Sequence, residues 1–150
     1  MAASALALDP ATRVTLQTDA GDLVLELAAD DAPTTVARFL GLVERGFFDG
    51  LRFHRVVSGF VAQAGDPGGD GYGGPGWWQR CEDSRAPYRR GTLGMALAGR
   101  DTGGQFFVAL GAQPHLETRY TPFGRVVEGL DVLDRILPGD RILRARTNRE

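Results

Sequence analysis

The sequence has no lysine, one cysteine and two histidines, and these absences narrow its possible chemistry. All 17 basic residues are arginine, which excludes a Schiff-base lysine and a Walker-type phosphate-binding lysine. A single Cys81 excludes an internal disulfide, and with two histidines it offers no obvious zinc-binding set. No histidine is near Cys81 in sequence, so we interpret it as structural rather than nucleophilic. We expect neither a metal nor a cofactor.

Long apolar runs and a strong charge are also missing. No run approaches the roughly 20 residues that a membrane helix needs, so we expect no membrane partner. A formal net charge of −2 gives no electrostatic attraction to nucleic acid, which we also exclude as a partner. Residues 1–12 lack the features of a signal peptide, so we expect a flexible leader and a cytoplasmic protein by default. A processed or secreted form is the alternative. We expect residues 13–150 to form one domain.

Alternating apolar and polar residues predict a mainly β fold. Residues 13–18 and 23–27 flank the turn sequence Asp-Ala-Gly-Asp and predict a hairpin. Further strand-like runs occupy 52–57, 60–65, 92–98, 105–110, 123–127 and 141–147. Because strands mostly adjoin strands, we expect about eight of them in a closed, mostly antiparallel β-barrel.

Two segments have helical spacing, and we expect them to cap the open ends of the barrel. Asp30 or Asp31 is the expected N-cap of the first helix, with Pro33 in its first turn. Its apolar residues follow at i, i+3, i+4 and i+7, namely Val36, Phe39, Leu40 and Val43. Gly46 is the expected stop. A second amphipathic helix is predicted over 128–136.

The glycine-rich stretch 68–78 contains the G-x-G-x-x-G spacing of a dinucleotide-binding turn at Gly69, Gly71 and Gly74. Such a site needs a helix that opens directly on the glycines within a β-α-β unit. Pro75 follows at once and the β-α-β rhythm is missing. We therefore interpret the stretch as a surface loop with positive φ angles rather than as a nucleotide site.

Several motifs, in order along the chain, resemble those of the cyclophilins, the barrel-shaped peptidyl-prolyl cis-trans isomerases. They are FHRVVSGFVAQAGD, GDGYGGPGW, GTLGMALAG, GGQFFVAL, PHLETRYTPFGRVVEG and GDRILRAR. The resemblance covers about Arg13 to Thr147. It implies a cyclophilin-like barrel capped by two α-helices, no cofactor, and catalysed rotation about Xaa-Pro peptide bonds that assists protein folding.

The resemblance implies that Arg55, Phe60 and Gln63 are catalytic. Arg55 is permanently charged and presents a fixed fork of N–H donors, which suits donation to the prolyl nitrogen. Taken alone, Arg55 would be interpreted as half of a surface ion pair. Gln63 would hold the guanidinium and bind the substrate backbone.

Strand alternation predicts which side chains share a face. Phe53, Arg55 and Val57 are expected on one face, with His54, as a structural residue, on the other. Farther along, Gln105 and Phe107 are expected to share a face, with Phe106 on the opposite one. The same resemblance implies a substrate-binding set of Val61, Ala96, Leu97, Gln105, Phe107, His115, Leu116 and Tyr120.

Two departures from relatives affect these expectations. A serine that usually precedes Gln105 is missing, and a one-residue slip within a strand would turn Gln105 and Phe107 to the wrong face. We expect Gly103 and Gly104 to absorb the gap in the loop. His115 stands where many relatives have tryptophan, so we expect weak cyclosporin binding.

Proline-containing peptides and unfolded or flexible protein segments are the expected partners, and the chain is expected to be a monomer. The alternative is a catalytically weak proline-peptide binding module or chaperone on the same barrel. The missing serine favours this alternative. The presence of Arg55, Phe60, Gln63 and Phe107 argues against it.

Overall fold

The computed structural model describes residues 12–68, 79–80, 86–98, 101–116 and 120–148. Most of the glycine-rich stretch, together with Cys81, lies outside these ranges, so the loop interpretation stays a prediction. Within the described residues, no helix is long and apolar enough to cross a membrane.

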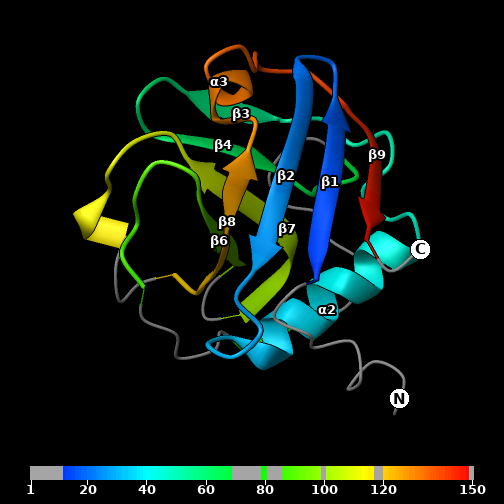
Figure 1. The fold of residues 1–150 in the computed structure, drawn as a ribbon, viewed down its shortest axis with the longest axis vertical. Helices are drawn as coiled ribbons and strands as arrows, with labels where there is room; N and C mark the ends of the chain where they lie inside the picture. Colours follow the sequence, from blue (N-terminus) through cyan, green and yellow to red (C-terminus); the bar gives the residue numbers. More distant parts are fainter. Residues whose placement is uncertain (1–11, 69–78, 81–85, 99–100, 117–119, 149–150) are drawn as a thin grey trace.

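A curled sheet forms most of the described structure (Figure 1). Its strands are β1 (Arg13–Thr18), β2 (Gly21–Leu27), β3 (Arg55–Val57), β4 (Val61–Ala64), β5 (Gln79–Arg80), β6 (Thr92–Ala98), β7 (Asp101–Ala109), β8 (Pro122–Glu128) and β9 (Ile142–Thr147). The order is β3-β4-β7-β6-β8-β2-β1-β9, with β5 paired to β7. Each of these pairings is antiparallel, as predicted, and β5 is an additional strand.

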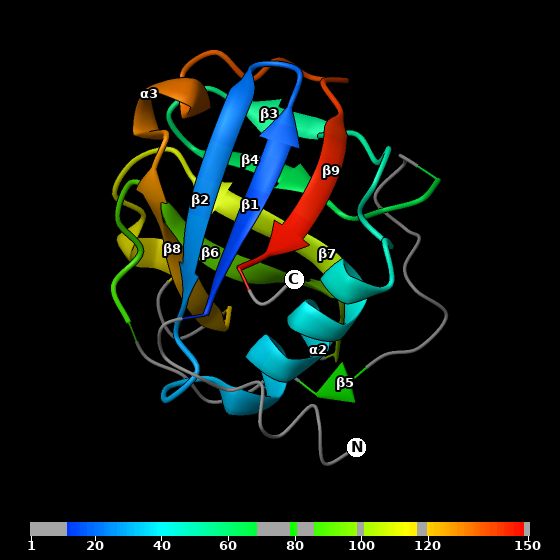
Figure 2. The ribbon, with the colours of Figure 1, turned by 45° about the vertical axis from the view of Figure 1, so that its right-hand side comes forward.

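The two ends of the sheet meet through the segment that leads into β3. An isolated antiparallel bridge joins Arg52 to Arg141, and the amide of Phe53 donates to the carbonyl of Asp140 at 2.7 Å. The segment before β3 is therefore hydrogen-bonded to the start of β9. Figures 1 and 2 show the resulting barrel from two sides.

The hairpin and the first helix lie where the sequence predicts them. Thr18 pairs with Gly21 across the turn between β1 and β2. Helix α2 (Pro33–Glu44) buries the predicted apolar stripe and ends before Gly46, whose φ is 74°. The prediction of Asp30 or Asp31 as N-cap is wrong. The N-cap is Ala32, which makes no side-chain capping bond.

The two α-helices lie near opposite ends of the barrel (Figure 2). Helix α3 spans only Leu130–Leu133, a single turn, where the sequence predicts a helix over 128–136. Val132 and Leu133 still pack into the core, so the apolar pattern is used over a shorter length. A short 3-10 helix, η1 (Pro114–Leu116), was not predicted.

Apolar side chains divide into two clusters. The larger fills the barrel and includes edge-on contacts of Phe106 with Phe39 and with Phe48. A smaller cluster consists of buried Val61, Tyr88, Phe107, Ala109 and Leu116, with Phe60 and Tyr120 packed against it. Phe106 and Phe107 are neighbours in β7 but point to opposite faces, as predicted. Phe106 therefore belongs to the larger cluster and Phe107 to the smaller one.

Candidate active site

Cross-strand pairing places four residues in one row across β3, β4, β7 and β6. Arg55 pairs with Gln63, Gln63 with Phe107, and Phe107 with Gly94. Directly opposed residues of antiparallel strands have Cβ atoms roughly 5 Å apart. Strand register alone therefore brings a cation, an amide and an aromatic ring together from distant parts of the sequence.

This row opens into a cavity of about 210 Å³ beside the smaller apolar cluster. Every residue that lines it belongs to the set named from the sequence: Arg55, Phe60, Val61, Gln63, Ala96, Phe107, Leu116 and Tyr120. Phe107 and Leu116 are each only 5% exposed, so the apolar part of the wall is nearly closed to water. The cavity offers apolar contact surface next to one exposed cation.

The ring of Phe60 contacts both a cation and a second aromatic ring. The guanidinium carbon of Arg55 is 5.4 Å from the centre of the Phe60 ring, a cation–π geometry. The imidazole of His115 stacks on Phe60 with centroids 5.6 Å apart and planes 26° apart. Phe60 thus orients Arg55 at the edge of the cavity.

Gln105 does not line the cavity and instead lies behind Gln63. It is 6% exposed, and its Oε1 accepts a hydrogen bond from Nε2 of Gln63 at 3.0 Å. The resemblance implies that Gln63 holds Arg55, but the observed contact of the guanidinium is with Phe60. Gln105 therefore orients the amide of Gln63, which lines the cavity.

The pairing of β6 with β7 is irregular just before Gln105, and the expectation that Gly103 and Gly104 absorb the missing serine stays a prediction. Met95 pairs with Phe106 and Leu97 with Thr102, so the register shifts between these pairs. The extra residues of β7 at this irregularity include Gly103 and Gly104. After this irregularity, Phe107 lies on the face that alternation predicts, opposite Phe106.

Two residues that the sequence analysis missed support the ring of Phe107. A Cβ at Gly94 would overlap the Phe107 ring and lie 2.6 Å from the hydroxyl of Tyr88, so glycine leaves the space that the ring occupies. Tyr88 stacks on Phe107 with centroids 5.7 Å apart and donates its hydroxyl to the carbonyl of Tyr120 at 2.9 Å. Burial raises the pKa of Tyr88, so this hydroxyl stays protonated as a donor.

One prediction about faces is wrong. Phe53 is fully buried in the barrel, whereas Arg55 and Val57 are exposed. The reason is that β3 begins only at Arg55, and the preceding residues pair with the chain before β9. His54 is partly buried and does not line the cavity. Ala96 lines it, while the side chain of Leu97 lies outside the described part of the structure.

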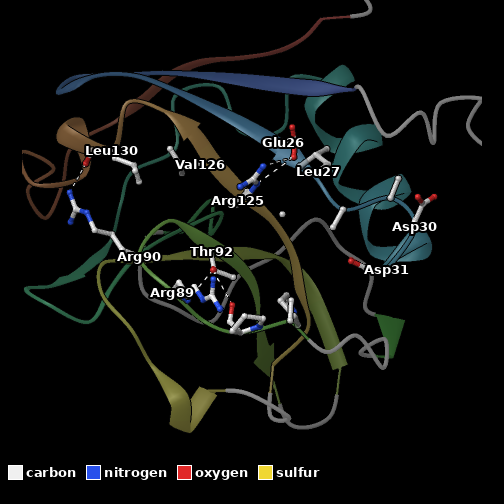
Figure 3. A pocket seen from close by; sticks show the side chains of 16 residues that line it. Glu26, Leu27, Asp30, Asp31, Arg89, Arg90, Thr92, Arg125, Val126 and Leu130 are labelled. Atoms are coloured by element: carbon white, nitrogen blue, oxygen red, sulfur yellow. Dashed lines mark hydrogen bonds and ion pairs between the residues drawn. The ribbon is translucent and has the colours of Figure 1, made fainter.

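A larger hollow of about 570 Å³ lies beside β2, β6 and β8 (Figure 3). Two of its arginines are engaged: Arg90 bonds both carboxylate oxygens of Asp134, and Arg125 bonds Glu26. Among the described residues, no group of three or more His, Cys, Asp or Glu side chains could hold a metal. Size alone would select this hollow, but the residues named from the sequence line the smaller cavity.

The described site thus combines an antiparallel barrel, an exposed arginine and a small, largely apolar cavity. Residues 13–148 match the family described as "Cyclophilin type peptidyl-prolyl cis-trans isomerase/CLD". The chain belongs to this cyclophilin-type family of peptidyl-prolyl cis-trans isomerases.

Known relatives agree in sequence and in structure. The chain is 50% identical over 133 residues to a peptidyl-prolyl cis-trans isomerase of Helicobacter pylori, covering 85% of this chain and 82% of the relative. A crystal structure of a cyclophilin-type isomerase from Cryptosporidium parvum has a TM-score of 0.86 at 29% identity, covering 91% and 97% of the two chains. A second structure of that protein, in the presence of the dipeptide Ala-Pro, has a TM-score of 0.83 at 30% identity and covers 89% and 96%.

Proposed function

We propose that the 210 Å³ cavity is where this chain isomerises Xaa-Pro bonds, with Arg55, Phe60 and Gln63 as catalytic residues. The observation that carries the proposal is the exposed guanidinium of Arg55, held by Phe60 at the rim of a nearly dry apolar wall. A cationic hydrogen-bond donor and an apolar wall are the two features that isomerisation of an Xaa-Pro bond requires.

The reaction needs neither a nucleophile nor a proton transfer. Rotation about the peptide bond has a barrier of about 18–20 kcal/mol, mostly because amide resonance is lost. In the twisted state the prolyl nitrogen becomes pyramidal and regains a lone pair. A donor aimed at that nitrogen binds the transition state more strongly than the planar ground state, which is the condition for catalysis.

Each part of the cavity has a distinct task in this mechanism. Phe60, Phe107 and Leu116 take up the proline ring and exclude water, which strengthens the electrostatic interaction. Arg55 donates an N–H to the pyramidal nitrogen. Gln63, oriented by Gln105, hydrogen-bonds the substrate backbone next to the proline. An acceleration from ~0.01 to ~1000 per second corresponds to roughly 7 kcal/mol, of which one charged donor supplies about 3.

Proline-containing peptides are the substrates that we propose, in line with the Ala-Pro dipeptide present with the Cryptosporidium neighbour. We extend this to unfolded or flexible protein segments, bound by a monomer. His115, stacked on Phe60, presents a smaller ring than tryptophan and so supports weak cyclosporin binding. The cytoplasmic location stays a prediction.

The test is NMR exchange between the cis and trans forms of an Ala-Pro peptide, which needs no coupling protease. Wild type should accelerate exchange, and Arg55→Ala should lose about two orders of magnitude. Arg144→Ala, an exposed arginine on β9, is the matched control and should keep the wild-type rate.

The outcomes separate the two candidate functions. Wild type that binds the peptide without accelerating exchange would overturn the isomerase and leave a proline-peptide binding module. An Arg55→Ala variant as fast as wild type would remove Arg55 from the mechanism while keeping the enzyme.

A further inference from the structure

The peptide unit that precedes the Phe60 ring is held at both ends. The amide of Phe60 donates to the carbonyl of Val57 at 2.9 Å, which closes the turn between β3 and β4. The carbonyl of Gly59 accepts a hydrogen bond from Nε2 of Gln113 at 2.7 Å. Gly59 has a φ of 73°, the left-handed conformation that glycine adopts readily. The side chain of Gln113 therefore helps to orient the Gly59–Phe60 peptide plane, and this plane sets the direction of the Phe60 side chain.

Gln113 is itself fixed by its own backbone. Its amide donates to the carbonyl of Tyr88 at 2.8 Å, and its carbonyl accepts from the amide of Leu116 at 3.0 Å. It is 7% exposed although it does not line the cavity. Gln113 thus connects three parts of the site: the turn that carries Phe60, Tyr88 beside Phe107, and Leu116 in the cavity wall.

We propose that Gln113 is a positioning residue, which aligns the Phe60 ring and, through it, Arg55 at the proline site. The proposal rests on the proposed function of that site. Without the Gln113 bond, the peptide unit between Gly59 and Phe60 is held at one end only, by the Phe60 amide that donates to the Val57 carbonyl. The peptide plane can then tilt about that remaining hydrogen bond. Such a tilt would move Phe60 away from both Arg55 and His115, which stack on it.

A neutral variant tests the hydrogen bond without a large change in size. Gln113→Met removes the donor and keeps a long unbranched side chain. The matched control is Gln17→Met on β1, a partly buried position outside the cavity. In Ala-Pro exchange measurements, we expect kcat/KM of folded Gln113→Met to fall roughly tenfold, and Gln17→Met to match wild type.

Two measurements distinguish a role of Gln113 in aligning Phe60 from a role in stabilising the fold alone. The ring protons of His115 sense the Phe60 ring current, so their NMR shift should move in Gln113→Met and remain in Gln17→Met. Loss should appear in both kcat and KM, because Phe60 contacts the proline and Arg55 reaches its nitrogen. A variant that is merely less stable would keep both values below its melting temperature.

A second variant serves if Gln113→Met does not fold. In Gln113→Glu the protonated carboxyl can donate to the Gly59 carbonyl, whereas the carboxylate is repelled by it. The ratio of Gln113→Glu to wild-type activity should therefore fall as pH rises. The ratio cancels the titration of His115, Tyr88 and Tyr120, the described titratable groups of this cluster, and of Asp134 across the turn.

The outcomes keep this proposal apart from the function on which it rests. Wild type without accelerated exchange would overturn the proposed function. Accelerated exchange by wild type, with Gln113→Met equally fast and the His115 shift unmoved, would overturn the positioning role alone. A flat Gln113→Glu ratio across pH would overturn it as well.

Discussion

The two largest differences between the cavities of this barrel are their size and the state of their arginines. The hollow beside β2 and β8 has about 570 Å³, within the usual range of about 300–1,000 Å³ for small-molecule sites. The cavity beside Arg55 has about 210 Å³, below that range but of the size that the proposed binding of one proline ring needs. Volume alone would rank them in the wrong order for this chemistry.

The interactions of the arginines explain why the smaller cavity is the better candidate for the active site. In the large hollow, two of the three lining arginines are ion-paired, Arg125 with Glu26 and Arg90 with Asp134. In the small one, Arg55 rests on the face of Phe60, whose π electrons orient a cation without using its N–H donors. Catalysis needs a donor that is held in place but still available, and an ion pair takes up the donor.

The largest expected effect comes from comparing Gly94, which lies against the cavity residue Phe107, with Gly41 in α2. Gly94→Ala should destabilise the fold by about 1–3 kcal/mol and lower peptide affinity at least tenfold, since the new Cβ displaces Phe107. Gly41→Ala in α2 meets nothing within 4 Å and should stabilise by about 0.5–1 kcal/mol with unchanged exchange. Urea unfolding and Ala-Pro titration measure both effects. Equal behaviour of the two variants would refute the tight fit at Gly94.

Sequence reasoning found the residues that line the smaller cavity but not those that support them. Arg55, Phe60 and Phe107 occur in motifs with a resemblance to guide the interpretation, and alternation gives their faces. Tyr88 and Gln113 lie in irregular segments, where no periodicity exists. Their contacts join residues far apart in sequence, with the Gln113 side chain 54 positions from Gly59, so only the fold reveals them.

The incorrect predictions have a common physical origin in the ends of elements. Strand alternation predicts Phe53 on the Arg55 face only if it extends two residues beyond the observed start of β3. Helix α3 was predicted over 128–136 because apolar spacing persists after the helix has ended at Leu133. Ala32, rather than either aspartate, is the N-cap, and backbone hydrogen bonds fix it: its amide donates to the Ala28 carbonyl and its carbonyl accepts from the Val36 amide. Tertiary contacts decide such boundaries.

Tyr88 stands between the cavities, with neighbouring residues Pro87 and Arg89 lining the large hollow. Tyr88→Phe removes the bond to the Tyr120 carbonyl and should cost about 1 kcal/mol of unfolding free energy, with a few-fold rise in KM. Burial raises the pKa of Tyr88 in the folded protein. The protonated Tyr88 hydroxyl therefore makes its full contribution to the free energy of unfolding below the ordinary tyrosine pKa of about 10. Above pH 10 the unfolded chain ionises first, so stability falls as pH rises.

Chemical denaturation across this pH range checks the assignment. Wild type should lose stability more steeply above pH 10 than Tyr88→Phe, because the variant lacks the hydroxyl. Tyr120→Phe is the comparison, since the donated bond comes from the Tyr88 hydroxyl and ends on the Tyr120 backbone. If the two variants and wild type shared one alkaline slope, Tyr88 would not be the group responsible.

The smallest effect belongs to the large hollow itself. Arg125→Ala removes a 3.2 Å ion pair with Glu26 whose arginine side chain is 67% exposed. Such pairs contribute about 0.2–1 kcal/mol, and salt screens them. We expect a small loss of unfolding free energy that shrinks in about 1 M salt, with Ala-Pro exchange at the wild-type rate. A double-mutant cycle with Glu26→Ala isolates the pair, because Arg13 also contacts Glu26. A marked fall in exchange would mean that this hollow takes part in isomerisation, and the separation of the two cavities by the interactions of their arginines would be wrong.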